Sequence, residues 1–134
     1  MTKSNRSFFD TNVLLYAVTS PGAKADISEE LIALGGVVSI QVLNEFAAVS
    51  RRKHNASWQN VKASLESFRA TLDIVPLTLE THQTGVALAE RYNFAIYDAM
   101  IVAAAKLAGC RTLYTEDLHN GQILDQLKIE NPFV

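Results

Sequence analysis

Four acids in this chain have the residue types and the surroundings to do chemistry together. Each lies next to an apolar segment, and they are Asp10, Glu45, Asp98 and Asp117. Carboxylates that crowd together raise one another's pKa values unless divalent cations neutralise them. Oxygen ligands favour Mg²⁺ or Mn²⁺, whereas Zn²⁺ would require His or Cys ligands. Because Mg²⁺ held by carboxylates also takes substrate phosphate, the matching reaction is phosphodiester hydrolysis by an activated water.

Asp10 ends the apolar run of residues 7–9 and is followed by Thr11, Asn12 and a second apolar run with helical spacing. This pattern predicts a strand, a sharp turn and a helix. Ligands collect at the carboxyl ends of the strands in an open α/β sheet, so Asp10 is expected in that crevice. The alternative is that Asp10 only caps the helix by accepting hydrogen bonds from its free N–H groups.

The segment that follows the predicted strand of residues 111–114 repeats this arrangement. Thr115, Glu116 and Asp117 place a hydroxyl and two acids in the turn after an apolar strand. The same sheet edge is therefore expected to carry acids from a second strand.

The other two acids lie in the opening turns of predicted helices. Glu45 belongs to a helix over residues 41–54, and Asp98 to an Ala-rich, almost wholly apolar helix over residues 94–109. The helix dipole alone favours an acid at such a place by about 0.3–1 kcal/mol. Glu45 can therefore be an acid that only stabilises the start of its helix or a member of the acidic site, and both interpretations stay open. A carboxylate in the most apolar helix carries a large desolvation cost unless a charge pairs with it. For Asp98 we therefore favour a metal or a partner charge over simple capping.

Strands and helices alternate along the whole chain. The remaining predicted elements are helices over 25–34, 57–72 and 78–92, strands over 37–40 and 73–77, and a final edge strand in the tail that Pro132 ends. This order predicts a single α/β domain over residues 1–134. Its central parallel sheet would have about four to five short strands, with helices on both faces.

The composition is that of a folded globular protein, with 49% hydrophobic and 19% charged residues. The sole cysteine, Cys110, lies in the apolar segment just before a predicted strand, which predicts a buried, inert thiol. A single cysteine that cannot form an internal disulfide also indicates a reducing cytoplasm. Residues 1–7 show no leader pattern, and no apolar run reaches about eighteen residues, so we expect neither export nor membrane insertion. The net charge of −2 would be +2 without the four acids, which leaves a polyanionic substrate possible.

Four motifs carry a resemblance to a known family. They are Phe9-Asp10-Thr11-Asn12, Asn44-Glu45-Phe46, Tyr97-Asp98-Ala99 with the apolar residues up to Ala105, and Leu113-Tyr114-Thr115-Glu116-Asp117. In this order they resemble the acidic motifs of the PIN-domain ribonucleases. With the closing Asn131-Pro132-Phe133, essentially the whole chain is similar to the small VapC-type toxins of bacterial and archaeal toxin–antitoxin pairs.

The resemblance implies a PIN-like fold and a Mg²⁺- or Mn²⁺-dependent endoribonuclease that acts as such a toxin. The matching metal-binding and catalytic positions are Asp10, Glu45, Asp98 and Asp117, supported by Asn12 and Thr115, which would orient carboxylates or bound water. It also implies an RNA substrate, a homodimer and a cognate antitoxin whose carboxy-terminal segment blocks the site. Asp117 occupies the family's Thr-x-Asp position. Glu116 is then a surface acid or an acid that contacts the metal ligands without binding the metal itself.

Two other classes of protein share part of this pattern. A catalytically weak PIN-like module would bind RNA or a partner protein without turnover, although the presence of all four acids argues against it. A phosphatase or receiver-type fold would need a second Asp where Asn12 stands, or an acidic pair before Asp10 and a Lys after the last strand. The sequence has neither of these features.

Overall fold

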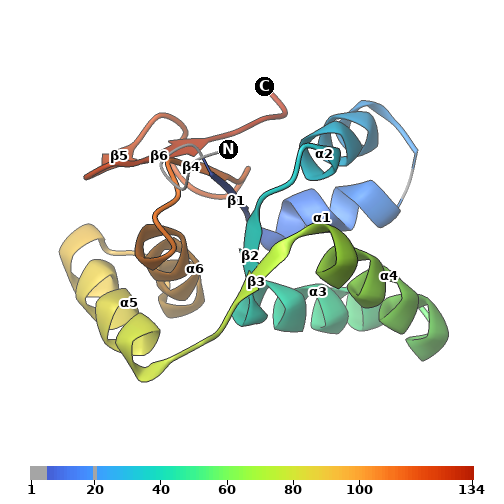
Figure 1. Ribbon diagram of the computed structural model, residues 1–134, viewed down its shortest axis with the longest axis horizontal. Helices are drawn as coiled ribbons and strands as arrows, with labels where there is room; N and C mark the ends of the chain where they lie inside the picture. Colours follow the sequence, from blue (N-terminus) through green and yellow to red (C-terminus); the bar gives the residue numbers. More distant parts are fainter. Residues whose placement is uncertain (1–5, 20) are drawn as a thin grey trace.

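The computed structural model describes residues 6–19 and 21–134 and builds them around one six-stranded sheet (Figure 1). Residues 1–5, where no leader was expected, lie outside the described residues. The strands are β1 (Ser7–Phe9), β2 (Val37–Ser39), β3 (Asp73–Val75), β4 (Thr112–Tyr114), β5 (Ile123–Leu124) and β6 (Leu127–Glu130). Their order is β3-β2-β1-β4-β6-β5, and every neighbouring pair is parallel except β5 with β6.

Six helices connect and cover the sheet in the described residues. They are α1 (Thr11–Val18), α2 (Ala23–Ala33), α3 (Ile40–Lys53), α4 (Trp58–Thr71), α5 (Leu79–Tyr92) and α6 (Ile96–Leu107). The helices α5 and α6 lie on one side of the sheet, and α1 to α4 lie on the other (Figure 1). The predicted α/β architecture, with a mostly parallel sheet between helices, is therefore confirmed.

The core includes the short apolar strands and the helix that was predicted to be buried, together with apolar residues of the other helices. Phe8, Phe9 and Leu113 are completely buried in the central strands β1 and β4. Residues 99–105 of α6 are also buried, because this helix is apolar on nearly every side. Cys110 is free and buried, and desolvation raises the pKa of its thiol to about 11, as expected of an inert cysteine.

The tail differs from the prediction. The predicted edge strand is an interior strand, because β6 pairs with β4 on one side and with the two-residue strand β5 on the other. A tight turn at Asp125, whose φ is +57°, folds β5 back against β6. The strand also ends at Glu130, before Pro132. Aspartate tolerates this left-handed conformation better than most residues do, which is why so short a hairpin can form here.

Several helix ends follow from local sequence. Ser39 caps α3 by accepting a hydrogen bond from the Val42 N–H at 3.3 Å, so this helix begins directly where β2 ends. Thr78 and Thr81 form a reciprocal capping box at the start of α5. Within residues 6–19 and 21–134, no helix combines the length and the apolar character that crossing a membrane requires.

Gly36 lets the chain before β2 pass close to β1. A Cβ atom at this position would lie 2.7 Å from Phe9 Cε2 and 2.8 Å from the Ser7 carbonyl oxygen. Because one obstacle is backbone and the other is a buried ring, we expect Gly36→Ala to lower the free energy of unfolding by about 2–3 kcal/mol. Urea denaturation followed by circular dichroism measures this loss.

The neighbouring Gly35 is the matched control. Its φ is +88° and a Cβ atom added there would meet nothing within 4 Å, so Gly35→Ala measures conformational strain without a clash. That strain is expected to cost about 1 kcal/mol. A loss at Gly36 no larger than the loss at Gly35 would contradict the close approach.

Candidate active site

The pairing of β1 with β4 sets the geometry of the site. Phe9 and Tyr114 are partners in the parallel ladder, and the Asp10 N–H donates to the Tyr114 carbonyl at 3.0 Å. The next residues, Asp10 and Thr115, therefore leave the sheet side by side. The Thr115 hydroxyl donates to Asp10 Oδ2 at 2.7 Å, although the two residues are 105 positions apart in the chain.

Asp10 is buried, with 4% of its surface exposed, and both of its carboxylate oxygens have a donor. The Thr11 N–H donates to Oδ1 at 2.6 Å, so Asp10 does cap α1, as the structural alternative expected. The second oxygen is the one bonded to Thr115. Asp10 therefore both caps α1 and belongs to a larger polar cluster.

The electrostatics of Asp10 link it to two other acids. Its pKa is raised from 3.8 to about 6, mainly by burial and in smaller part by the negative charges of Asp117 and Glu45. The hydrogen bonds from Thr115 and Thr11 act in the opposite direction, since they favour the charged form. The carboxylates of Glu45 and Asp117 are therefore near enough to oppose the ionisation of Asp10.

Asp98 joins the same group through Asp117. Burial, and then the charge of Asp117, raise the pKa of Asp98 above its ordinary value of 3.8. Asp98 lies in the first turn of α6, which begins at the carboxyl edge of the sheet. The Asp98 residue is partly buried there. All four predicted acids are thus connected by charge: Asp10 with Glu45 and Asp117, and Asp98 with Asp117.

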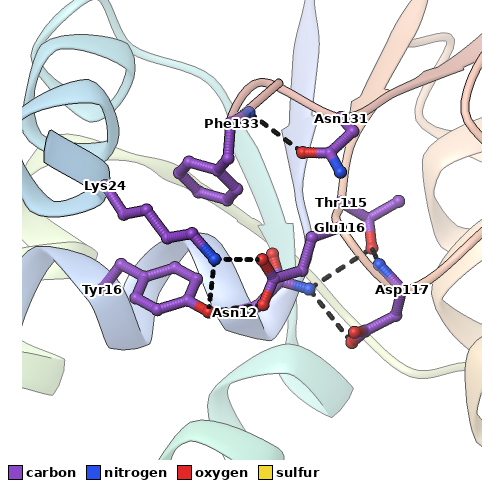
Figure 2. Close-up of polar contacts among 8 residues, drawn as sticks. All are labelled: Asn12, Tyr16, Lys24, Thr115, Glu116, Asp117, Asn131 and Phe133. Carbon is purple, nitrogen blue, oxygen red and sulfur yellow. Dashed lines mark hydrogen bonds and ion pairs between the residues drawn. The ribbon is translucent and has the colours of Figure 1, made fainter.

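Asn12 and Thr115 support this arrangement (Figure 2). Asn12 Nδ2 donates to Asp117 Oδ2 at 3.1 Å and to the Thr115 hydroxyl at 3.3 Å. The Asp117 N–H also donates to the Thr115 hydroxyl, at 3.1 Å. Asn12 Oδ1 is buried and has no hydrogen-bond partner among residues 6–19 and 21–134.

Glu45 is held by two residues that the sequence analysis did not assign to the site. Thr11 donates its hydroxyl to Oε1 at 3.3 Å, and Gln41 Nε2 donates to Oε2 at 2.9 Å. Gln41 precedes Glu45 by four residues on α3, a spacing that does bring two side chains together on a helix. The signal for Gln41 was therefore present, whereas Thr11 is explained equally well as part of a helix start.

The two adjacent acids in the turn after β4 point in different directions (Figure 2). Asp117 lies beside Asn12, whereas the Glu116 carboxylate is paired with Lys24 at 3.0 Å and accepts a hydrogen bond from Tyr16 at 2.5 Å. Glu116 is thus engaged away from the other acids. Sequence spacing gives no indication of these partners, which lie 92 and 100 positions from Glu116.

The acids are grouped but not tightly clustered. Among residues 6–19 and 21–134, no three His, Cys, Asp or Glu side chains are arranged closely enough to hold a metal ion. Asp117 is exposed, and Glu45 and Asp98 are partly exposed.

The profile of the PIN domain family matches residues 7–121. The chain belongs to the PIN domain family. The matched region holds every acid of the candidate site together with Asn12 and Thr115. A sequence search of curated proteins finds no match.

Solved structures with a similar fold include a toxin–antitoxin complex and a toxin. A toxin–antitoxin complex from Klebsiella pneumoniae superposes with a TM-score of 0.73 at 18% identity, covering 95% of this chain and 98% of that one. VapC20 of Mycobacterium tuberculosis, described as a sarcin-ricin loop cleaving toxin, gives 0.69 at 16% identity over 83% and 91%. VapBC2 from Rickettsia felis, bound to a promoter DNA fragment, gives 0.68 at 22% identity over 93% and 97%. At these identities the likeness shows the fold alone.

The raised pKa of Asp10 makes the stability of this PIN domain depend on pH. The folded protein holds this proton up to pH 6, whereas the unfolded chain releases it near 3.8. The stability that the proton confers is therefore complete below the unfolded value and is lost as the pH rises through the folded value. With metal removed by EDTA, Asp10→Asn should gain roughly 3 kcal/mol relative to wild type between about pH 4 and pH 8.

Urea denaturation at a series of pH values measures this difference. Asp26→Asn is the control, because it removes an exposed carboxylate from α2 and so accounts for the loss of one charge. A difference between Asp10→Asn and wild type that does not vary with pH would contradict the buried, proton-binding carboxyl.

Proposed function

We propose that this PIN domain protein is a metal-dependent endoribonuclease that hydrolyses RNA phosphodiester bonds and acts as the toxin of a toxin–antitoxin pair. The observation that carries the proposal is the hydrogen-bond network of Thr11, Asn12 and Thr115, which joins the carboxylates of Asp10, Glu45 and Asp117. Asp98 is linked to this network through the charge of Asp117. Support also comes from the similar fold of VapC20, a toxin described as cleaving an RNA loop.

The kinds of donor at the site fit Mg²⁺ or Mn²⁺. Carboxylates are hard oxygen ligands, as is Asn12 Oδ1, which has no hydrogen-bond partner in the part of the chain that the structure describes. The hydrogen bonds of the cluster involve no His or Cys. Asp10, Asp98 and Asp117 would hold such an ion, with Glu45 beside them. A bound divalent cation supplies Lewis-acid stabilisation of the charge that develops on the phosphate oxygens.

The residues of the chain have distinct tasks in this proposal. Thr115 and the Thr11 N–H fix Asp10 in one orientation, and Asn12 fixes Asp117. Glu45, which accepts hydrogen bonds from Thr11 and Gln41, is a fixed carboxylate that can take the proton of the attacking water. Burial of Asp10 lowers the local dielectric, which strengthens the attraction between these acids and a cation.

The proposal extends to the partners and the location of the protein. Structures with this fold include complexes of a toxin with an antitoxin. We propose a cognate antitoxin for this chain, a homodimeric state and a cytoplasmic location, where RNA is available. A gene neighbour that encodes a small DNA-binding protein with an amphipathic tail would support the antitoxin.

One observation favours a second function. Since no three acids of the described residues stand in a metal-binding arrangement, a PIN-like module that binds RNA or a partner protein without turnover is the alternative. This alternative predicts RNA binding in EDTA and no cleavage when Mg²⁺ or Mn²⁺ is added. The two proposals therefore predict different results in any assay that measures RNA binding separately from RNA cleavage.

The test is cleavage of purified RNA by the purified protein with Mg²⁺ or Mn²⁺. We expect EDTA to abolish cleavage, and Asp98→Asn and Asp10→Asn to lower kcat/KM by about 100-fold or more, because charge stabilisation at the reacting phosphate is lost. Asp26→Asn, on the exposed surface of α2, should keep full activity. Full activity in EDTA, or in both site variants with native circular dichroism spectra, would remove the assignment.

A further inference from the structure

A second polar cluster stands directly beside the candidate site (Figure 2). It joins Tyr16 of α1, Lys24 of α2, Glu116 of the turn after β4, and Phe133 near the end of the chain. The four residues come from separate segments, and none of them has a task in the proposed hydrolysis. One of them, Glu116, nevertheless directly precedes Asp117 in the chain.

The polar groups of Tyr16, Lys24 and Glu116 form a closed set of contacts. Lys24 Nζ lies 3.0 Å from Glu116 Oε2 and donates to the Tyr16 hydroxyl at 3.2 Å. The Tyr16 hydroxyl in turn donates to Glu116 Oε1 at 2.5 Å. Each carboxylate oxygen of Glu116 therefore has its own donor, and Lys24 neutralises its charge.

Aromatic contacts extend this set to the end of the chain. The Tyr16 and Phe133 rings meet edge to face at 5.1 Å, and Lys24 Nζ lies 4.7 Å and 5.6 Å from their centroids. The Phe133 N–H donates to Asn131 Oδ1 at 2.9 Å, and the Asn131 N–H donates to Asn120 Oδ1 at 2.8 Å. The carboxy-terminal segment is thus tied to α1, to α2 and to the loop after Asp117.

The connection to the site is through the backbone. Glu116 stands between Thr115, which is bonded to Asp10, and Asp117, which is bonded to Asn12. Asp117 itself is exposed, so packing does little to fix its position. Anchoring the Glu116 side chain to Tyr16 of α1 and Lys24 of α2 therefore adds a restraint on the turn beyond the hydrogen bonds from Asn12.

We propose that Tyr16, Lys24 and Glu116 are positioning residues, which hold the 115–117 turn so that Asp117 faces Asp10 and Asn12. The proposal rests on the proposed metal-dependent hydrolysis for its effect on activity, but the position of Asp117 can be tested without RNA. A partly exposed ion pair adds little to global stability, so its loss should affect the turn more than the fold.

Charge exchange separates positioning from simple electrostatics. Lys24→Glu adds negative charge near the acids, and Glu116→Lys adds positive charge, so electrostatics alone would strengthen Mn²⁺ binding in the first variant and weaken it in the second. Positioning predicts that both variants weaken Mn²⁺ binding. The double variant Lys24→Glu/Glu116→Lys restores an ion pair, and the Tyr16 hydroxyl can donate to one partner and accept from the other.

The experiment measures free Mn²⁺ by electron paramagnetic resonance in titrations of the full chain, alongside RNA cleavage kinetics. We expect each single variant to raise the Mn²⁺ dissociation constant and to lower kcat by about 10- to 100-fold, as a displaced catalytic group would, with KM for RNA unchanged. The double variant should recover most of both losses, and Lys24→Arg should keep Mn²⁺ binding and kcat close to wild type. Glu116→Gln provides a milder test should either charge reversal fail to fold.

The control is Lys106→Glu, which breaks the ion pair between Lys106 at the end of α6 and Asp125 in the β5–β6 turn. It should leave Mn²⁺ binding and kcat unchanged. The proposal is overturned if the two charge reversals have opposite effects on Mn²⁺ binding, or if they lower the melting temperature and leave Mn²⁺ binding unchanged. A rise in KM alone would also overturn it, because it would mean that Lys24 contacts RNA phosphate. Altered Mn²⁺ binding in the variants of a protein that does not cleave RNA would support the positioning role and refute the proposed function.

Discussion

The hydrogen bond from Thr115 to Asp10 is the contact on which the rest of the site depends. It forms because β1 and β4 are adjacent, parallel and in register, so that the residues after Phe9 and Tyr114 emerge together. Asp10 then caps α1, and the Thr115 hydroxyl also receives donors from Asn12 and from the Asp117 backbone. One buried hydroxyl thereby fixes the relative positions of two acids from distant parts of the chain.

This arrangement has an energetic cost that a purely structural role does not explain. Asp10 is buried close to other acids, and its pKa of about 6 means that ionisation at neutral pH destabilises the folded state. An amide at this position would cap the helix without that cost. A destabilising group that is nevertheless held by two donors is typical of a functional site, because ligand binding can offset the cost.

The fold could be predicted because its signals are local. Short apolar runs followed by Asp10 or by Thr115 indicate strand ends, and the apolar character of α6 on nearly every side indicates a buried helix. The pairing of β5 with β6 could not be predicted in the same way, because it depends on the turn at Asp125 and not on an apolar run. The partners of Glu116 lie far away in the sequence, so tertiary contacts alone reveal which way that side chain points.

The central claim is that the four acids of this PIN domain serve one divalent cation. The most direct test is a crystal structure of the protein grown with Mn²⁺, with data collected at the manganese absorption edge. We expect an anomalous peak at bonding distance from Asp10 and Asp117, with Asp98 or Glu45 turned toward it. A manganese peak elsewhere on the protein, with these carboxylates unliganded at saturating Mn²⁺, would contradict the claim.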